Sequence, residues 1–186
     1  NPGESVKTPF NVYEDSSFEH NTVLYYLKNG KRVTGYCKRS DIKKNAKDID
    51  KFKVFLPKGY GAGETYPHQI LGQPEFGCAN SVCSQTYVYS AFDTEEESIN
   101  FGKYIKTRFL RALVFAVKIT QHANDKCYRF VPLQDFTSNS DINWNDTIEG
   151  IDYQLYKKYG ITPDEQNFIE SMIKPIIEGK GEVFLE

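Results

Sequence analysis

The chain has 186 residues, of which 39% are hydrophobic and 26% are charged. These proportions are typical of a folded globular domain and exclude a disordered chain, and no apolar run of about 18 residues is present to cross a membrane. The chain begins at Asn1 and no signal-peptide pattern follows. We therefore interpret residues 1–186 as a single domain taken from a longer protein.

The net charge of −2 conceals an uneven distribution of charged residues. Residues 31–58 contain ten basic and three acidic residues, and residues 103–118 contain five basic and no acidic residues. Residues 135–186 contain eleven acidic and four basic residues. A domain with this layout can present a positive face to a polyanion while its total charge stays near zero. Nucleic-acid binding is one hypothesis, and ordinary solvated charged faces are the alternative.

The four cysteines do not indicate a disulfide scaffold or a zinc site. They stand at positions 37, 78, 83 and 127, without a Cys-x-x-Cys pair. Cys78 and Cys83, with His68 nearby, form only a weak metal-binding pattern. We expect reduced thiols and a cytoplasmic location.

The first half of the chain is rich in predicted strands. Residues 23–27 and 32–37 flank the turn pair Asn29-Gly30, which predicts a β-hairpin. Residues 40–45 are expected to form a short helical turn capped by Ser40. Strands are predicted over residues 52–56 and over residues 81–89, where apolar and polar side chains alternate.

The second half is predicted to be mainly helical. Thr94 and Glu97 form a capping box that opens a long amphipathic helix over residues 94–120. A strand is predicted over residues 128–131. Thr162, Pro163 and Glu165 have the pattern of a second helix start near the C-terminus. The sequence therefore predicts an α+β domain with a strand-rich half, a long amphipathic helix and a C-terminal helix.

Two local motifs have possible functional meaning. Residues 59–63 contain three glycines and lack the spacing of a nucleotide loop, so we interpret them as a flexible loop beside a backbone phosphate. Asp164, Glu178 and Lys180 are the residue types of a magnesium-dependent nuclease, and this function is kept as an alternative. The three histidines are scattered, and no nucleophile stands in a recognisable motif. We expect no catalytic site, metal or cofactor in this chain.

Several strings resemble one enzyme family when they are taken in order. They occupy residues 35–45, 53–61, 69–72, 81–87, 104–111, 130–136, 155–160 and 168–173. The set resembles the C-terminal part of bacterial adenine-specific DNA methyltransferases of restriction–modification systems, including fused type II restriction enzymes. The order of strand, loop, strand and long helix is similar to the target recognition domains of TaqI-type methyltransferases and type I specificity subunits.

The resemblance implies a specificity domain without the methyl-transfer site. The family's catalytic half uses an Asn/Asp-Pro-Pro-Tyr/Phe motif and a glycine-rich loop for S-adenosylmethionine, and neither is present here. The expected partners are double-stranded DNA and the catalytic methyltransferase domain of the same parent chain. The cofactor S-adenosylmethionine would then belong to that parent.

The candidate DNA contacts are chosen for the chemistry of their side chains. Lysine and arginine neutralise phosphates, whereas an amide can pair with adenine in the major groove. The first group is Arg39, Lys43, Lys44, Lys58, Tyr60 and Gln69. The second group, from the long predicted helix, is Lys106, Arg108 and Arg111. A non-catalytic protein-interaction module, with the acidic C-terminal helix as its contact, is a further alternative.

Overall fold

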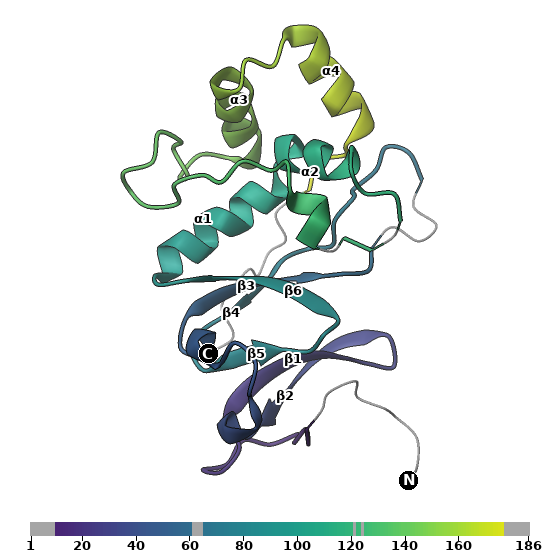
Figure 1. The fold of residues 1–186 in the computed structure, drawn as a ribbon. Coiled ribbons are helices and arrows are strands. Elements are labelled where there is room, and N and C mark those ends of the chain that lie inside the picture. The colour runs from purple at the N-terminus through teal and green to yellow at the C-terminus, as the bar shows by residue number, and fades with distance from the viewer. Residues whose placement is uncertain (1–9, 61–64, 121, 124, 177–186) are drawn as a thin grey trace.

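The computed structural model describes residues 10–60, 65–120, 122–123 and 125–176. These residues form three layers, with one sheet at the bottom of Figure 1, a second sheet above it and the helices on top. The mixture of two small sheets with four α-helices confirms the predicted α+β class. Across the described ranges, no helix has the length and apolar character to cross a membrane.

The first sheet has the strand order β2-β1-β5. Strands β1 (Thr22–Lys28) and β2 (Lys31–Cys37) pair antiparallel. Asn29 and Gly30 join them with φ angles of 54° and 75°, which are the positive values that a tight hairpin turn requires. The predicted hairpin is therefore confirmed. Strand β5 (Ser81–Cys83) adds to β1 in parallel.

The second sheet has the order β4-β3-β6, with β3 (Phe52–Pro57) at its centre. Strand β3 confirms the predicted strand over residues 52–56, whereas β4 (Glu75–Gly77) was not predicted. The single strand predicted over residues 81–89 is wrong. The chain leaves the first sheet after β5, turns, and enters the second sheet as β6 (Tyr87–Phe92).

The long predicted helix is two helices. Thr94 caps α1 (Glu95–Lys106) through the expected capping box with Glu97. Thr107 then has extended φ and ψ angles of −61° and 146°, which end α1. Its side chain accepts a hydrogen bond from the Leu110 backbone N–H and so caps α2 (Arg108–Phe115). A threonine favours a cap over a helix interior because its hydroxyl can satisfy such a donor.

The remaining elements partly match the sequence. Helix α4 (Pro163–Met172) starts with the predicted capping box, whereas α3 (Ile148–Lys158) was not predicted. The predicted strand over residues 128–131 is wrong because the chain there leaves the short 3-10 helix η3 (Asp125–Tyr128) through a turn.

The segment between β2 and β3 contains two short 3-10 helices in place of the predicted helical turn over residues 40–45. These are η1 (Arg39–Asp41) and η2 (Ala46–Asp48). Ser40 lies inside η1, and Lys38 precedes that helix without a side-chain cap. This turn prediction is therefore wrong in its bounds and its cap.

Strand β3 separates two apolar regions because its side chains alternate between the two faces of the sheet. Leu56 belongs to the large core beneath the helices. Phe55 points the other way and packs with Tyr25 and Tyr87 between the sheets. Lys53 lies on this same face, and its ammonium reaches Ser81 of the first sheet. The space between the sheets is thus partly apolar and partly polar.

Candidate nucleic-acid interface

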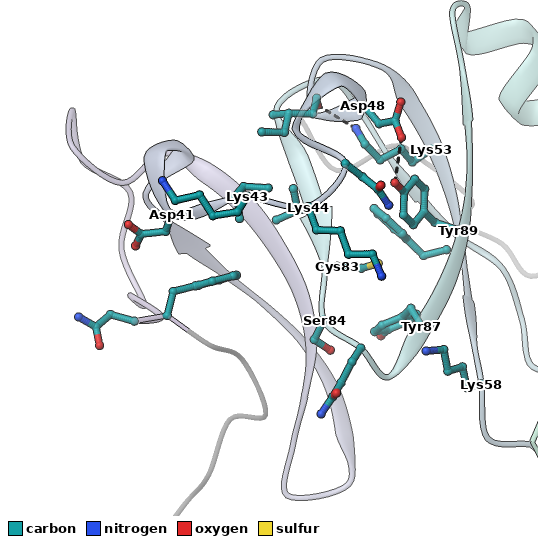
Figure 2. Close-up of a pocket in the computed structure, with 18 residues that line it drawn as sticks. Asp41, Lys43, Lys44, Asp48, Lys53, Lys58, Cys83, Ser84, Tyr87 and Tyr89 are labelled. Carbon is teal, nitrogen blue, oxygen red and sulfur yellow. Dashed lines mark hydrogen bonds between the residues drawn. The ribbon is translucent and has the colours of Figure 1, made fainter. Parts of the chain in front are cut away.

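A cleft of about 980 Å³ opens beside the two sheets. Its walls include residues 41–45 of the segment between β2 and β3, and residues 82–85 between the sheets. Lys53 and Phe55 of β3 and Tyr87 and Tyr89 of β6 also line it, as shown in Figure 2. The rest of the lining is Phe10, Asn11, Asp48, Ile49 and Lys58. The cleft therefore depends on segments that are far apart in the sequence.

Basic side chains outnumber acidic ones in the lining. The charged residues are Lys43, Lys44, Lys53 and Lys58, with Asp41 and Asp48. The Lys43 ammonium donates to the Ser40 carbonyl of its own segment at 2.7 Å. The side-chain ammoniums of Lys44 and Lys58, by contrast, make no hydrogen bond or ion pair with any residue that the structure describes. In Figure 2, Lys44 extends toward Cys83, and Lys58 extends toward Tyr87.

Lys53 holds the base of the cleft together. The side chain is buried, and its ammonium donates to the carbonyls of Ile49 at 2.8 Å and Lys51 at 2.6 Å. Ser81 Oγ lies 3.5 Å from the same nitrogen. Burial lowers the pKa of Lys53 to about 8, because the surroundings disfavour its charged form. The ammonium thus ties the segment before β3 to the start of β5.

The tyrosines of the cleft are neutral hydrogen-bond donors. Tyr89 donates to Asp48 at 2.9 Å, and Tyr87 donates to Glu75 at 3.2 Å. Burial, followed by the bond to Asp48, raises the pKa of Tyr89 to about 12. Burial also raises the pKa of Tyr87 well above its ordinary value. Both phenols therefore stay protonated and act as hydrogen-bond donors to carboxylates.

Three of the predicted DNA contacts come together, and three of the same group do not. Lys43, Lys44 and Lys58 line the cleft. Arg39 lies outside it and forms an ion pair with Asp50. Tyr60 and Gln69 do not line the cleft either.

Tyr60 and Gln69 make hydrogen bonds with nearby residues of the same chain. The Tyr60 carbonyl accepts a hydrogen bond from the Lys118 ammonium at 2.8 Å. The Gln69 amide donates to the Leu71 carbonyl at 2.9 Å. In the glycine loop, Gly59 bridges to His122, whereas residues 61–64 lie outside the described residues. The loop's predicted phosphate contact stays a prediction.

The second group of predicted contacts lies in the helical layer. The side chains of Lys106 and Arg111 are buried, with relative exposures of 1% and 0%. Arg108 Nε donates to the Ile173 carbonyl at 3.1 Å. Such side chains have little or no free surface for a phosphate, so we leave these three residues out of the interface. None of the three lines the cleft.

Sequence reasoning missed Gln85, which lines the cleft between β5 and β6. The three residues 84–86 are all polar and interrupt an otherwise strand-like run. Such a polar cluster is a turn signal, and it was available in the sequence. Its position beside two lysines became visible only when both sheets were assembled.

Of the three residues of the nuclease alternative, only Asp164 lies in the described chain, so their clustering stays a prediction. Asp164 lies in the first turn of α4, while Glu178 and Lys180 lie outside the described residues. Within the described ranges, no group of three or more His, Cys, Asp or Glu residues is placed to hold a metal ion. Burial raises the pKa of the Cys83 thiol to about 12, which disfavours the thiolate that a metal requires.

Comparisons with protein-family models, with curated proteins and with solved structures find no match to this chain.

Proposed function

We propose that this chain is the DNA target recognition domain of an adenine-N6 DNA methyltransferase of a restriction–modification system. It binds double-stranded DNA through the cleft between the sheets. The observation that carries the proposal is the pair of ammoniums of Lys44 and Lys58, which line one cleft without a protein partner among the described residues. Positive side chains that line a concave surface and form no ion pair suit a phosphate backbone.

The other charges of the strand-rich half support this location. Five basic residues there form ion pairs, which reduces their attraction for a distant anion. The pairs are Lys28–Glu14, Arg32–Glu75, Lys38–Glu19, Arg39–Asp50 and Lys51–Asp93. Positive potential is therefore best preserved along the segment that carries Lys43 and Lys44 and along the opposite wall at Lys58.

The methyl-transfer chemistry belongs to another part of the proposed parent. That part binds S-adenosylmethionine and receives the flipped adenine, while this domain holds the DNA in place. The partners of the domain are then DNA and the catalytic domain of its own parent chain, in the cytoplasm. Whether the parent also cleaves DNA does not alter the role of the cleft.

Salt-dependent DNA binding tests the proposal. The chain is mixed with a pool of random duplexes without metal, and affinity is measured at several salt concentrations. Bound duplexes are then sequenced. We expect affinity to fall steeply with salt, because bound lysines release counterions from the DNA, and we expect one short sequence to be enriched. Absence of binding at low salt would refute the proposal and favour a protein-interaction module.

The size of the cleft favours one second candidate. Its volume of about 980 Å³ lies at the upper end of small-molecule pockets, so an anionic ligand of nucleotide size is the alternative occupant. A competition experiment with free mononucleotides separates the two. If a mononucleotide binds with micromolar affinity and duplex DNA does not bind, the small ligand is the better assignment.

A further inference from the structure

The turn over residues 84–86 places at the edge of the cleft one side-chain amide, that of Gln85, without a hydrogen bond to the described residues. Gln85 is exposed and lines the cleft, and its side chain makes no hydrogen bond to the residues that the structure describes. Its neighbours differ from it in this respect. Ser84 is buried, and its hydroxyl lies 2.6 Å from the hydroxyl of Thr86.

The backbone before Gln85 is hydrogen-bonded to the first sheet, and the backbone after it is hydrogen-bonded to the end of β3 in the second sheet. The Ser84 N–H donates to the Tyr25 carbonyl of β1 at 2.9 Å. The Thr86 carbonyl accepts a hydrogen bond at 2.9 Å from the Lys58 N–H, which directly follows β3. Because the backbone on both sides is held by hydrogen bonds, the Cα of Gln85 has a well-defined position, which recognition at a fixed position requires.

The charges around Gln85 fit a reader of base edges. The hydrogen bond between Lys58 and Thr86 places the Lys58 side chain next to the turn, and Lys44 approaches from the opposite wall of the cleft. Lysines that contact phosphates fix the register of a duplex, and a polar side chain between them can then reach the bases. A glutamine amide offers one donor and one acceptor, which match N7 and N6 of adenine in the major groove.

We propose that Gln85 is a specificity-determining residue that reads an adenine in the recognised sequence. This inference rests on the proposed function, since it assumes that duplex DNA occupies the cleft. It differs from the sequence-based choice of Gln69, whose amide donates to the Leu71 carbonyl.

Selection from random duplexes tests Gln85 directly. The wild-type chain, Gln85→Ala and Gln85→Glu are each used to enrich sequences, and Gln73→Ala is the matched control because Gln73 is an exposed glutamine outside the cleft. We expect Gln85→Ala to lose about 10- to 100-fold discrimination at one adenine position. Its affinity for random DNA and its salt slope should stay unchanged. Gln85→Glu should shift the preference at that position toward cytosine, whose N4 amino group donates to a carboxylate.

The outcomes separate this inference from the proposed function. If the wild-type chain enriches a sequence and Gln85→Ala enriches the same sequence equally well, the role of Gln85 is refuted while DNA recognition stands. If the wild-type chain binds DNA without enriching any sequence, Gln85 reads no base and the domain is a non-specific binder. If the wild-type chain does not bind DNA, both proposals fail. Loss of discrimination in Gln73→Ala as well would also contradict a specific role for Gln85.

Discussion

In the helical layer, basic side chains point inward and bind backbone carbonyls. Lys103 donates to the Trp144 carbonyl at 2.6 Å, and Lys118 donates to the Ile70 carbonyl at 2.8 Å. In the cleft, the side-chain ammoniums of Lys44 and Lys58 line the wall and make no hydrogen bond or ion pair with the described residues. Both regions come from stretches of sequence that are rich in basic residues. The difference is that helix ends and loops packed in a core bring unpaired carbonyls close to a basic side chain, whereas no described carbonyl lies within hydrogen-bond reach of the Lys44 or Lys58 ammonium.

This comparison teaches that a run of positive charge has two physical meanings. A lysine or arginine can donate hydrogen bonds to backbone carbonyls inside a core, or it can remain available to bind an anion. Substitutions in the first region should therefore change the free energy of unfolding, and those in the second should change binding. The following predictions test this division, from the largest expected effect on stability to the smallest.

Arg111 should have the largest effect on stability. Its guanidinium donates to the carbonyls of Thr107, Gln69 and Lys174, at 3.1, 3.2 and 2.8 Å. Replacing it with methionine keeps much of the volume but removes these charge-assisted bonds, so we expect a loss of about 3 kcal/mol or more. Urea unfolding measures the effect, with the exposed Arg129→Met as control. Equal stability of the two variants would contradict the structural role of Arg111.

Asp152 should have the second largest effect on the free energy of unfolding. Its carboxylate accepts the backbone N–H groups of Arg108 and Phe109, at 2.9 and 2.8 Å, and so caps the start of α2 from α3. Asp152→Ala leaves both donors buried without this acceptor, and we expect a loss of about 2 to 3 kcal/mol. Asp152→Asn keeps one acceptor oxygen and should lose less. A reversed order of the two variants in thermal or urea unfolding would refute the capping role.

Lys53 should make stability depend on pH. Its pKa of about 8 in the fold lies below the ordinary value of 10.5, so between these two values the unfolded chain binds more protons than the folded chain. The unfolding free energy must therefore rise with pH in this window, by about 2 kcal/mol from this residue. Urea unfolding of the wild type and of Lys53→Met from pH 7 to pH 10 measures the difference, which cancels the titration of other groups. A constant difference would show that Lys53 titrates at its ordinary pKa.

The double variant Lys44→Ala and Lys58→Ala should leave stability within about 0.5 kcal/mol, because neither ammonium has a described partner. Its effect should appear in DNA binding, where the slope of log affinity against log salt becomes shallower by about two. Lys31→Ala with Lys157→Ala is a control of equal charge, since both lysines are exposed outside the cleft. If the control flattens the slope equally, the attraction is a property of net charge and not of the cleft.

The parts of the fold that were predictable depend on local signals. The hairpin at Asn29-Gly30 and the helix starts at Thr94 and Thr162 follow from residues within a few positions of one another. The break at Thr107 was not predictable from periodicity, because apolar spacing continues through it. At this break Asp152, distant in sequence, accepts hydrogen bonds from the backbone donors at the start of α2.

The candidate site was only partly accessible to sequence reasoning for a related reason. Charge density selected Lys43, Lys44 and Lys58, which line the cleft, but in its second group it also selected Lys106 and Arg111, which are buried. Burial depends on which carbonyls the tertiary structure leaves without partners. A single sequence shows where the basic residue stands but not which carbonyl or carboxylate lies beside it in the fold.

The parallel pairing of β1 with β5 determines when the cleft can exist during synthesis. Thr22 and Asn80, 58 positions apart, are joined by a side-chain hydrogen bond of 2.8 Å beside this pairing. A hairpin such as β1–β2 forms early because its contacts are local, but two strands alone are only marginally stable. The third strand, the turn at Gln85 and the wall at Tyr89 arrive much later from the ribosome. A nascent chain therefore carries Lys44 and Lys58 before the cleft that they line is complete.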